Sequence, residues 1–298
     1  MMSEQHSNSI VNAMTVDVEE HFQVTAFAKT IDRNTWDDLP SRVVDNTIRL
    51  LDLFAEVGVK ATFFMLGLVA QRHPDLMRRI AENGHELGSH GQSHKLIYEQ
   101  TPQEFRDELR ISKELIEDAC GIEVRGYRAA SFSIRASNLW ALEEIAERGF
   151  TYDSSVFPVV HDLYGMPGAP RGIYRVKLAS GRSLIEVPPS TLACGRWILP
   201  VAGGGYLRIF PRWFTNWAIK KLNRREHCPA IIYVHPWEVD PDQPRVDGAP
   251  WRSRARHYTN LRTTLPKLGY LLRAYNFTTM SEMIEHSGEL ESVSLEIN

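Results

Sequence analysis

The stretch that decides the fold runs from residue 10 to residue 20 and reads IVNAMTVDVEE. Its apolar residues come first and its carboxylates come last, which is typical of a buried strand whose C-terminal end carries functional groups. Helical and strand-like segments then alternate: helices at 41–57, 74–83, 101–119 and 138–148, and strands at 60–66, 85–89, 124–128 and 151–153. This alternation predicts an α/β fold, a barrel or a wound sheet of parallel strands with functional groups at the C-terminal strand ends.

Composition and length limit the class of protein. A chain of 298 residues that is 43% hydrophobic and 24% charged can form one large α/β domain. The net charge of −3 gives no electrostatic reason to expect either a nucleic acid or an acidic membrane as partner. No apolar run reaches the ~20 residues of a membrane span, and no signal peptide is visible. The three cysteines are widely spaced, which fits a reducing compartment. For these reasons we expect a cytoplasmic location.

The organisation favours a single domain. We expect this domain over residues 10–285, between an N-terminal tail at 1–9 and a C-terminal tail at 286–298. From 157 to 200, prolines and glycines interrupt every helical pattern, which predicts irregular insertions with short β segments in the later part of the chain. The sequence AGGGY at 202–206 continues this pattern, so we expect a loop there as well.

Two acids crowd the end of the first predicted strand. Asp17 and Glu19 share one face, and Glu20 points to the other, because side chains alternate along a strand. Carboxylates this close repel each other unless a cation neutralises them or one stays protonated. A metal on Glu19 would leave Asp17 free to act as a base. The residues alone are equally compatible with two solvated acids in a loop.

Two histidines follow the third predicted strand in the sequence HGQSH, at positions 90 and 94. Imidazoles four residues apart lie on one face of a helical turn, and the small residues around them would let an ion approach. With one carboxylate from a distant strand they would form a three-ligand site with an open position, as in hydrolytic metal centres. The alternative is two unrelated surface histidines in a chain that has eleven.

Three more candidates stand at predicted strand ends. Arg128 begins RAASFS, Asp153 lies in YDSS, and His235 follows IIYV. A buried arginine could hold Asp17 ionised, and a histidine at the end of a buried strand is suited to proton transfer near neutral pH. The ordinary alternatives are a surface or capping arginine, an aspartate in a turn and a structural histidine.

In their order along the chain, these motifs resemble the polysaccharide deacetylase superfamily, the NodB homology domain of carbohydrate esterase family 4. The opening DVE, YDSSVFP at 152–158 and YVHPWE at 233–238 resemble the branch found in exopolysaccharide loci beside exosortase systems. The resemblance extends from about Asn12 to about Glu285 and implies a distorted (β/α)7 barrel.

The resemblance also implies roles for individual residues. Asp17 matches the catalytic base and Arg128 the residue that orients it, while His235 matches the general acid and Asp153 its carboxylate partner. The metal ligands match Glu19, His90 and His94. Phe132, Tyr206 and Trp237 could stack on sugar faces, or they could simply pack the barrel.

Three positions depart from the usual family pattern. Val18 separates two acids that are normally adjacent, and Glu19 replaces an aspartate as ligand. Ala130 stands where the arginine motif usually has proline, which puts the shape of that loop in question.

The implied reaction is hydrolysis of N-acetyl groups on amino sugars of a polysaccharide or its biosynthetic intermediate, releasing acetate. A divalent ion is expected as cofactor, with Zn²⁺ favoured, although the same ligands accept Co²⁺, Ni²⁺, Fe²⁺ or Mn²⁺. The expected partner is an N-acetylated carbohydrate. Two alternatives stay open: a related metal-dependent amidase of small cyclic amides or ureides, and an inactive carbohydrate-binding homologue.

Overall fold

The computed structural model describes residues 10–161, 164–195, 197–201 and 203–295. The predicted N-terminal tail at 1–9 lies outside these residues. The first half of the chain contains β1 (Asn12–Val18), α1 (Val43–Val57), β2 (Thr62–Met65), α2 (Gly67–Arg72), α3 (Pro74–Glu82), β3 (Glu86–Ser89), α4 (Pro102–Cys120), β4 (Gly126–Tyr127), α5 (Trp140–Glu147) and β5 (Tyr152–Asp153).

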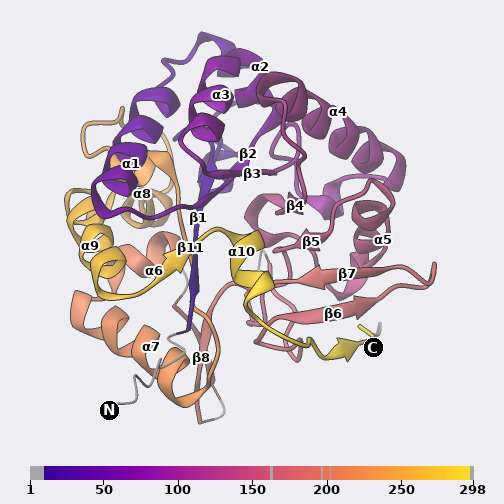
Figure 1. The fold of residues 1–298 in the computed structure, drawn as a ribbon. Helices are drawn as coiled ribbons and strands as arrows, with labels where there is room; N and C mark the ends of the chain where they lie inside the picture. The colour runs from indigo at the N-terminus through magenta and orange to yellow at the C-terminus, as the bar shows by residue number, and fades with distance from the viewer. Residues whose placement is uncertain (1–9, 162–163, 196, 202, 296–298) are drawn as a thin grey trace.

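The second half begins with four strands and ends with a mixture of helices and short strands. These are β6 (Tyr174–Lys177), β7 (Ser183–Glu186), β8 (Thr191–Cys194), β9 (Trp197–Pro200), α6 (Gly204–Ile209), α7 (Arg212–Arg225), β10 (Ile231–Val234), α8 (Trp251–Tyr258), α9 (Leu261–Ala274), β11 (Phe277–Thr278), α10 (Met280–Glu285) and β12 (Ser292–Val293). Figure 1 shows the helices arranged around the outside of the strands.

One mostly parallel sheet organises the fold. Among the described residues its order is β10-β1-β2-β3-β4-β5-β7-β6-β12, with β11 also paired to β1. Only the β6–β7 pair in this sheet is antiparallel within that part of the chain. The α/β fold that we expected is therefore confirmed, and in the described ladder no pairing closes β10 onto β12.

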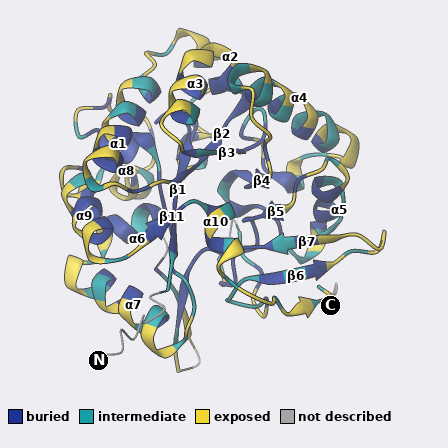
Figure 2. Cartoon of the chain, in the orientation of Figure 1, coloured by how far each residue is buried: buried dark blue, intermediate teal, exposed yellow. Residues whose placement is uncertain are grey.

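Strand β1 lies between β10 and β2 and is buried along its whole length. Met14, Val16 and Val18 belong to the main hydrophobic core, which they share with Leu50 and Phe54 of α1. The intervening residues Thr15 and Asp17 point to the other face of the sheet because side chains alternate along a strand. That face therefore carries buried polar groups. Figure 2 shows the same division, with buried strands and helices that are exposed only on their outer sides.

Several local features differ from the sequence-based expectation. We expected loop from Gly203 to Tyr206, but α6 begins at Gly204 after a close backbone approach. A Cβ on Gly203 would lie 2.0 Å from the carbonyl oxygen of Tyr233, which explains why this position is glycine. The predicted C-terminal tail contributes β12, which pairs with β6. No helix in the described part of the chain combines the length and apolarity needed to cross a bilayer.

Candidate metal and catalytic site

Three potential metal ligands meet where β1 and β3 end. Glu19 follows β1, and His90 follows β3 directly. Glu19, His90 and His94 are all buried, and one ligand atom of each lies within 4.8 Å of the others. The parallel pairing of β1 with β2 and of β2 with β3 brings these strand ends to one edge of the sheet. The structure thus brings together the three residues that we expected to bind a metal.

The two histidines approach each other through a loop, and not through the helical turn that their spacing suggested. Gly91 and His94 both have left-handed backbone conformations, with φ of 79° and 56°. Glu108 of α4 accepts hydrogen bonds of 3.0 Å from the backbone of Gln92 and of Ser93. Arg33 donates to the carbonyl oxygen of His94 over 2.9 Å. Neither supporting residue was predicted, because both contacts are long-range.

The protonation of these residues suits a divalent cation. His90 Nδ1 donates to the carbonyl oxygen of Arg128 over 2.8 Å, which leaves Nε2 as the ligand atom. Burial lowers the pKa of His90 to about 4, so its imidazole is neutral at pH 7. Burial alone would raise the pKa of Glu19, but His94 and the other imidazoles outweigh it and lower this pKa to about 2.

A buried oxygen without a hydrogen bond provides a direct test of fit. Glu19 Oε1 accepts from Trp237 Nε1 over 3.1 Å, whereas Oε2 has no hydrogen bond and lies 2.8 Å from His94 Nε2. Leaving a buried carboxylate oxygen unsatisfied is costly unless a cation completes its coordination. One carboxylate and two imidazoles are also the donor set of many catalytic zinc sites. The residues present therefore fit a metal ion.

Asp17 is held beside this cluster by a fully buried arginine. Arg128 Nη1 donates to Asp17 Oδ1 over 2.6 Å and to Thr15 Oγ1 over 2.8 Å. Its Nη2 donates to Ser154 Oγ over 2.9 Å. Such a charge-assisted bond fixes one oxygen of the carboxylate and leaves Oδ2 for another partner. Arg128 therefore occupies the position that we expected for the residue orienting the base.

His235 faces the same site from the end of β10. Its Nε2 lies 4.0 Å from Asp17 Oδ2 and 3.7 Å from Glu19 Oε1. Its Nδ1 donates to Glu238 Oε2 over 2.9 Å. Burial alone would lower the pKa of His235, but Glu238 and the two other carboxylates raise it to about 9.

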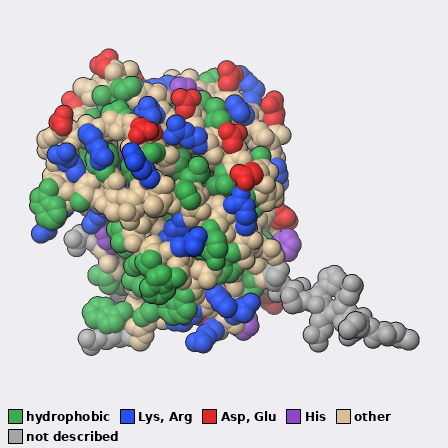
Figure 3. Space-filling view, turned by 90° about the vertical axis from the view of Figure 1, so that its left-hand side faces the viewer, with side chains coloured by type: hydrophobic (Ala, Val, Ile, Leu, Met, Phe, Trp, Pro, Cys, Tyr) green, Lys and Arg blue, Asp and Glu red, His purple; other side chains and the backbone are tan. Residues whose placement is uncertain are grey.

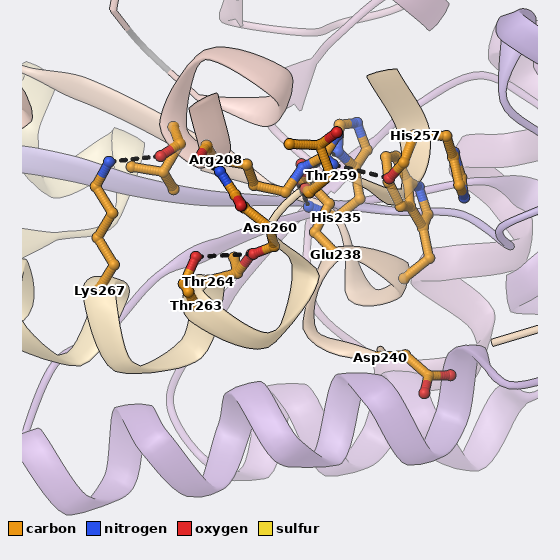
Figure 4. A network of polar contacts seen from close by, with 12 residues as sticks. Arg208, His235, Glu238, Asp240, His257, Thr259, Asn260, Thr263, Thr264 and Lys267 are labelled. Carbon is orange, nitrogen blue, oxygen red and sulfur yellow. Dashed lines mark hydrogen bonds and ion pairs between the residues drawn. The ribbon is translucent and has the colours of Figure 1, made fainter. Parts of the chain in front are cut away.

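Glu238 is itself held by Arg208 of α6 (Figure 4). Arg208 Nε donates to Glu238 Oε1 over 2.6 Å, and its Nη1 donates to the carbonyl oxygens of His257 and Thr259, both over 2.8 Å. Burial would raise the pKa of Glu238, but Arg208 and His235 lower it to about 2. The imidazole is thus oriented by a buried carboxylate that is fixed by a buried cation.

The carboxylate beside His235 is Glu238, and not Asp153 as we expected. Asp153 lies in β5, directly opposite Glu186 of β7, and accepts from Ser155 Oγ over 2.6 Å. Burial raises the pKa of Asp153 to about 6, and it raises the pKa of Glu186 further, with the charge on Asp153 adding to the effect. The pair therefore retains a proton at neutral pH, and Asp153 holds Ser155, which accepts from the backbone of Ala129 over 2.8 Å.

The three aromatic residues proposed to stack on sugar rings differ in their surroundings. Trp237 packs between His235 and His257, with ring centroids 5.0 and 4.1 Å away, so both of its faces are covered. Phe132 is 6% exposed and packs against Phe157, Tyr164 and Tyr233. These two side chains pack the site, which is the alternative noted for them, and Tyr206 alone among the three is half-buried.

Comparisons with known proteins agree with this geometry. A family model described as "Polysaccharide deacetylase" matches residues 33–150, and one described as "Domain of unknown function (DUF3473)" matches residues 154–285. A peptidoglycan deacetylase from Helicobacter pylori is 36% identical over 249 residues, which are 82% of this chain and 78% of that protein. A peptidoglycan-N-acetylglucosamine deacetylase from Bacillus cereus is 32% identical over 111 residues, which are 37% of this chain and only 40% of that relative's length.

Solved structures support the fold. A candidate polysaccharide deacetylase from Mycobacterium smegmatis superimposes with a TM-score of 0.61 at 20% identity, covering 96% of this chain and 92% of that one. The allantoinase Puue superimposes with a TM-score of 0.60 at 14% identity, covering 93% and 90%. The extended match to the Helicobacter pylori enzyme, together with the first family model, shows that this chain belongs to the polysaccharide deacetylase family.

Proposed function

We propose that this chain is a metal-dependent hydrolase that removes N-acetyl groups from amino sugars of a polysaccharide or of its biosynthetic intermediate. One observation carries the proposal: Asp17 and His235 face each other across 4.0 Å, directly beside the Glu19, His90 and His94 cluster. A base and an acid on either side of a cation site are what amide hydrolysis requires.

Glu19, His90 and His94 would hold the divalent ion. When bound, the ion would polarise the acetyl carbonyl group and make a water molecule more acidic. A site of two imidazoles and one carboxylate suits Zn²⁺, while Co²⁺, Ni²⁺, Fe²⁺ and Mn²⁺ accept the same ligands.

The protein's own side chains move the protons. Asp17 Oδ2 takes a proton from the attacking water, while Arg128 keeps Oδ1 fixed and stabilises the carboxylate. His235 Nε2 gives a proton to the amine nitrogen as the C–N bond breaks, so that acetate and a free amino sugar leave. Glu238 keeps the Nδ1 proton of His235 in place, which directs Nε2 toward the substrate.

The substrate class rests on the named relatives. These include the peptidoglycan-N-acetylglucosamine deacetylase from Bacillus cereus, whose name gives an N-acetylated amino sugar, and a chitooligosaccharide deacetylase from Rhizobium leguminosarum. We place the reaction in exopolysaccharide biosynthesis and in the cytoplasm. The three cysteines are all unpaired and fit a reducing compartment.

Acetate release tests the proposal. The protein is incubated with N-acetylated oligosaccharides, polymers and sugar precursors, after chelation and again after adding each metal. Asp17→Asn and His235→Ala should abolish release, and the exposed controls Asp52→Asn and His286→Ala should retain it. No release from any substrate with metal present, ring opening of a small ureide instead, or release that resists chelation would each contradict the proposal.

A further inference from the structure

Helix α7 presents an unusual outer face. Trp213 is 70% exposed and Trp217 is 43% exposed. Together with Lys220 and Arg224 they occupy positions i, i+4, i+7 and i+11, which form one stripe along a helix. The opposite side of α7 is buried, so the helix is firmly packed while its aromatic stripe faces solvent.

Apolar side chains extend this stripe toward α6. Phe214 contacts Phe210 and Trp217, with ring centroids 4.6 and 5.4 Å away. Ile209, the last residue of α6, is 54% exposed. Figure 3 looks onto the side of the molecule that carries α7, and it shows hydrophobic side chains gathered low on this face with lysine and arginine side chains beside them.

The β8–β9 hairpin adjoins the same face. Lys221 Nζ donates to the carbonyl oxygen of Ala193 over 2.8 Å, and Ala193 pairs with Ile198 in the hairpin. Ile198 is 39% exposed and its neighbour Trp197 is 67% exposed. We call the whole surface the α7 face: its apolar members are Trp197, Ile198, Ile209, Phe210, Trp213, Phe214 and Trp217, and its basic members are Arg212, Lys220, Lys221, Arg224 and Arg225.

The charge of this face is entirely positive along the helix. Residues 212–225 include five lysines and arginines and no aspartate or glutamate, in a chain whose net charge is −3. Glu226, just beyond the helix, pairs with Arg171 over 2.6 Å and lies 3.9 Å from Lys221. The α7 face therefore combines exposed tryptophan and isoleucine with an excess of cations.

We propose that the α7 face docks the protein onto the surface of a bilayer that contains anionic phospholipids. Tryptophan prefers the membrane–water interface, and isoleucine can enter the acyl boundary. Lysine and arginine extend their charged ends to lipid phosphates while their stems cover apolar surface. The positive charge of the α7 face is thus complementary to the negative charge of the phospholipid head groups.

Two other occupants fit this face less well. In a symmetric dimer the same patch would meet itself, so the five cations of each α7 would face one another. A neutral glycan could stack on the tryptophans, but it has no use for the exposed isoleucines or for the clustered positive charge. Ile209 follows Arg208 directly, so the docking surface and the groups that orient His235 are joined through α6.

Co-sedimentation with vesicles tests the proposal. We expect the protein to bind vesicles of phosphatidylcholine mixed with phosphatidylglycerol, to bind vesicles of phosphatidylcholine alone much less, and to dissociate as salt is raised. Lys220→Glu with Arg224→Glu should weaken binding about tenfold or more, and Trp213→Ala with Trp217→Ala should weaken it on both kinds of vesicle.

Matched substitutions elsewhere serve as controls. Ile122, which follows α4, is 38% exposed and compares directly with Ile198 at 39%; Arg110 on α4 is the matched charge. Ile122→Ala and Arg110→Glu should leave vesicle binding unchanged, whereas Ile198→Ala should reduce it. Thermal melting shows whether each variant is folded, independently of any enzymatic activity.

Three results of the vesicle experiment would overturn the proposal. They are failure to sediment with anionic vesicles at low salt, equal binding to neutral and anionic vesicles, and unchanged binding by folded variants of the α7 face. Light scattering that finds a dimer dissolved by Trp213→Ala with Trp217→Ala would also overturn it, because a second copy would then be the occupant.

Discussion

Replacing Glu238 by glutamine removes the negative charge between His235 and Arg208 while keeping the shape of the side chain. Arg208 and Glu238 are buried, and Arg208 Nε donates to Glu238 Oε1 over 2.6 Å. Breaking a buried ion pair leaves the remaining charge without a partner, and we expect a loss of about 3 kcal/mol because glutamine can still accept one hydrogen bond. In a chain of this length such a loss lowers Tm by about 6 °C.

The same substitution should impair catalysis. Without the Glu238 carboxylate, the Nδ1 proton of His235 is no longer held by a charge-assisted bond, so Nε2 is poorly directed toward the leaving amine. We expect kcat for acetate release to fall about 100-fold, within the range that a general acid contributes, with little change in KM. Steady-state kinetics and calorimetry on one preparation give both values.

Glu186→Gln is the matched control, because Glu186 is equally buried but is kept protonated. Glutamine resembles the protonated acid, so this variant should keep its kcat and should not lose Tm. The account of His235 would be refuted if E238Q retained both Tm and kcat while E186Q or Asp153→Asn lost them. That outcome would assign the histidine's partner to the Asp153 side of the site.

Three further predictions concern the buried charges and the ligands. Because folding raises the pKa of Asp153 to about 6, its contribution to stability is fully present below about pH 4 and is lost as the pH rises through 6. Burial also raises the pKa of Glu186, so the parent loses stability as the pH rises through the ordinary range of a glutamate, whereas glutamine cannot titrate. E186Q should therefore gain stability relative to the parent as the pH rises in thermal melts; a constant difference would contradict a protonated Glu186. Arg128→Met leaves Asp17 buried without its cation and should cost about 3–5 kcal/mol and all measurable activity, whereas Arg128→Lys should recover part of both. Chelation should lower Tm, since a bound ion stabilises only the folded chain, and Glu19→Gln should remove this response; an unchanged Tm on chelation would count against a metal at this site.

The sequence predicts the position of a site residue when the direction of its side chain is determined by the strand or helix that contains it. The alternation along β1 predicts that Asp17 and Glu19 share a face, and it also predicts the opposite direction of Glu20, which accepts hydrogen bonds from the backbone of Arg42 and Val43 at the start of α1. The α4 start signals at Thr101 and Glu104 are likewise local, and the structure has the capping box there. Such features need no knowledge of distant partners.

Other features depend on pairings between distant segments. Asp153 lies beside Glu186 because β5 pairs with β7, a neighbour that no local pattern identifies. The proximity of His90 and His94 depends on Glu108 and Arg33, which hold the loop from two other elements. Glu238 did have a local signal, since it follows His235 by three residues within one short turn. That spacing allows the glutamate to reach back to the histidine, so HPWE can be interpreted as a histidine with its own carboxylate.

The central claim is that one metal ion, held by Glu19, His90 and His94, supports removal of N-acetyl groups. The most direct test is a titration of metal-free protein with Zn²⁺, in which acetate release from an N-acetylated oligosaccharide and bound metal are measured in parallel. Our account predicts that both rise together and saturate at one ion per chain, and that His94→Ala abolishes both. Full acetate release by the metal-free protein, or a His94→Ala variant that binds metal and releases acetate like the parent, would contradict it.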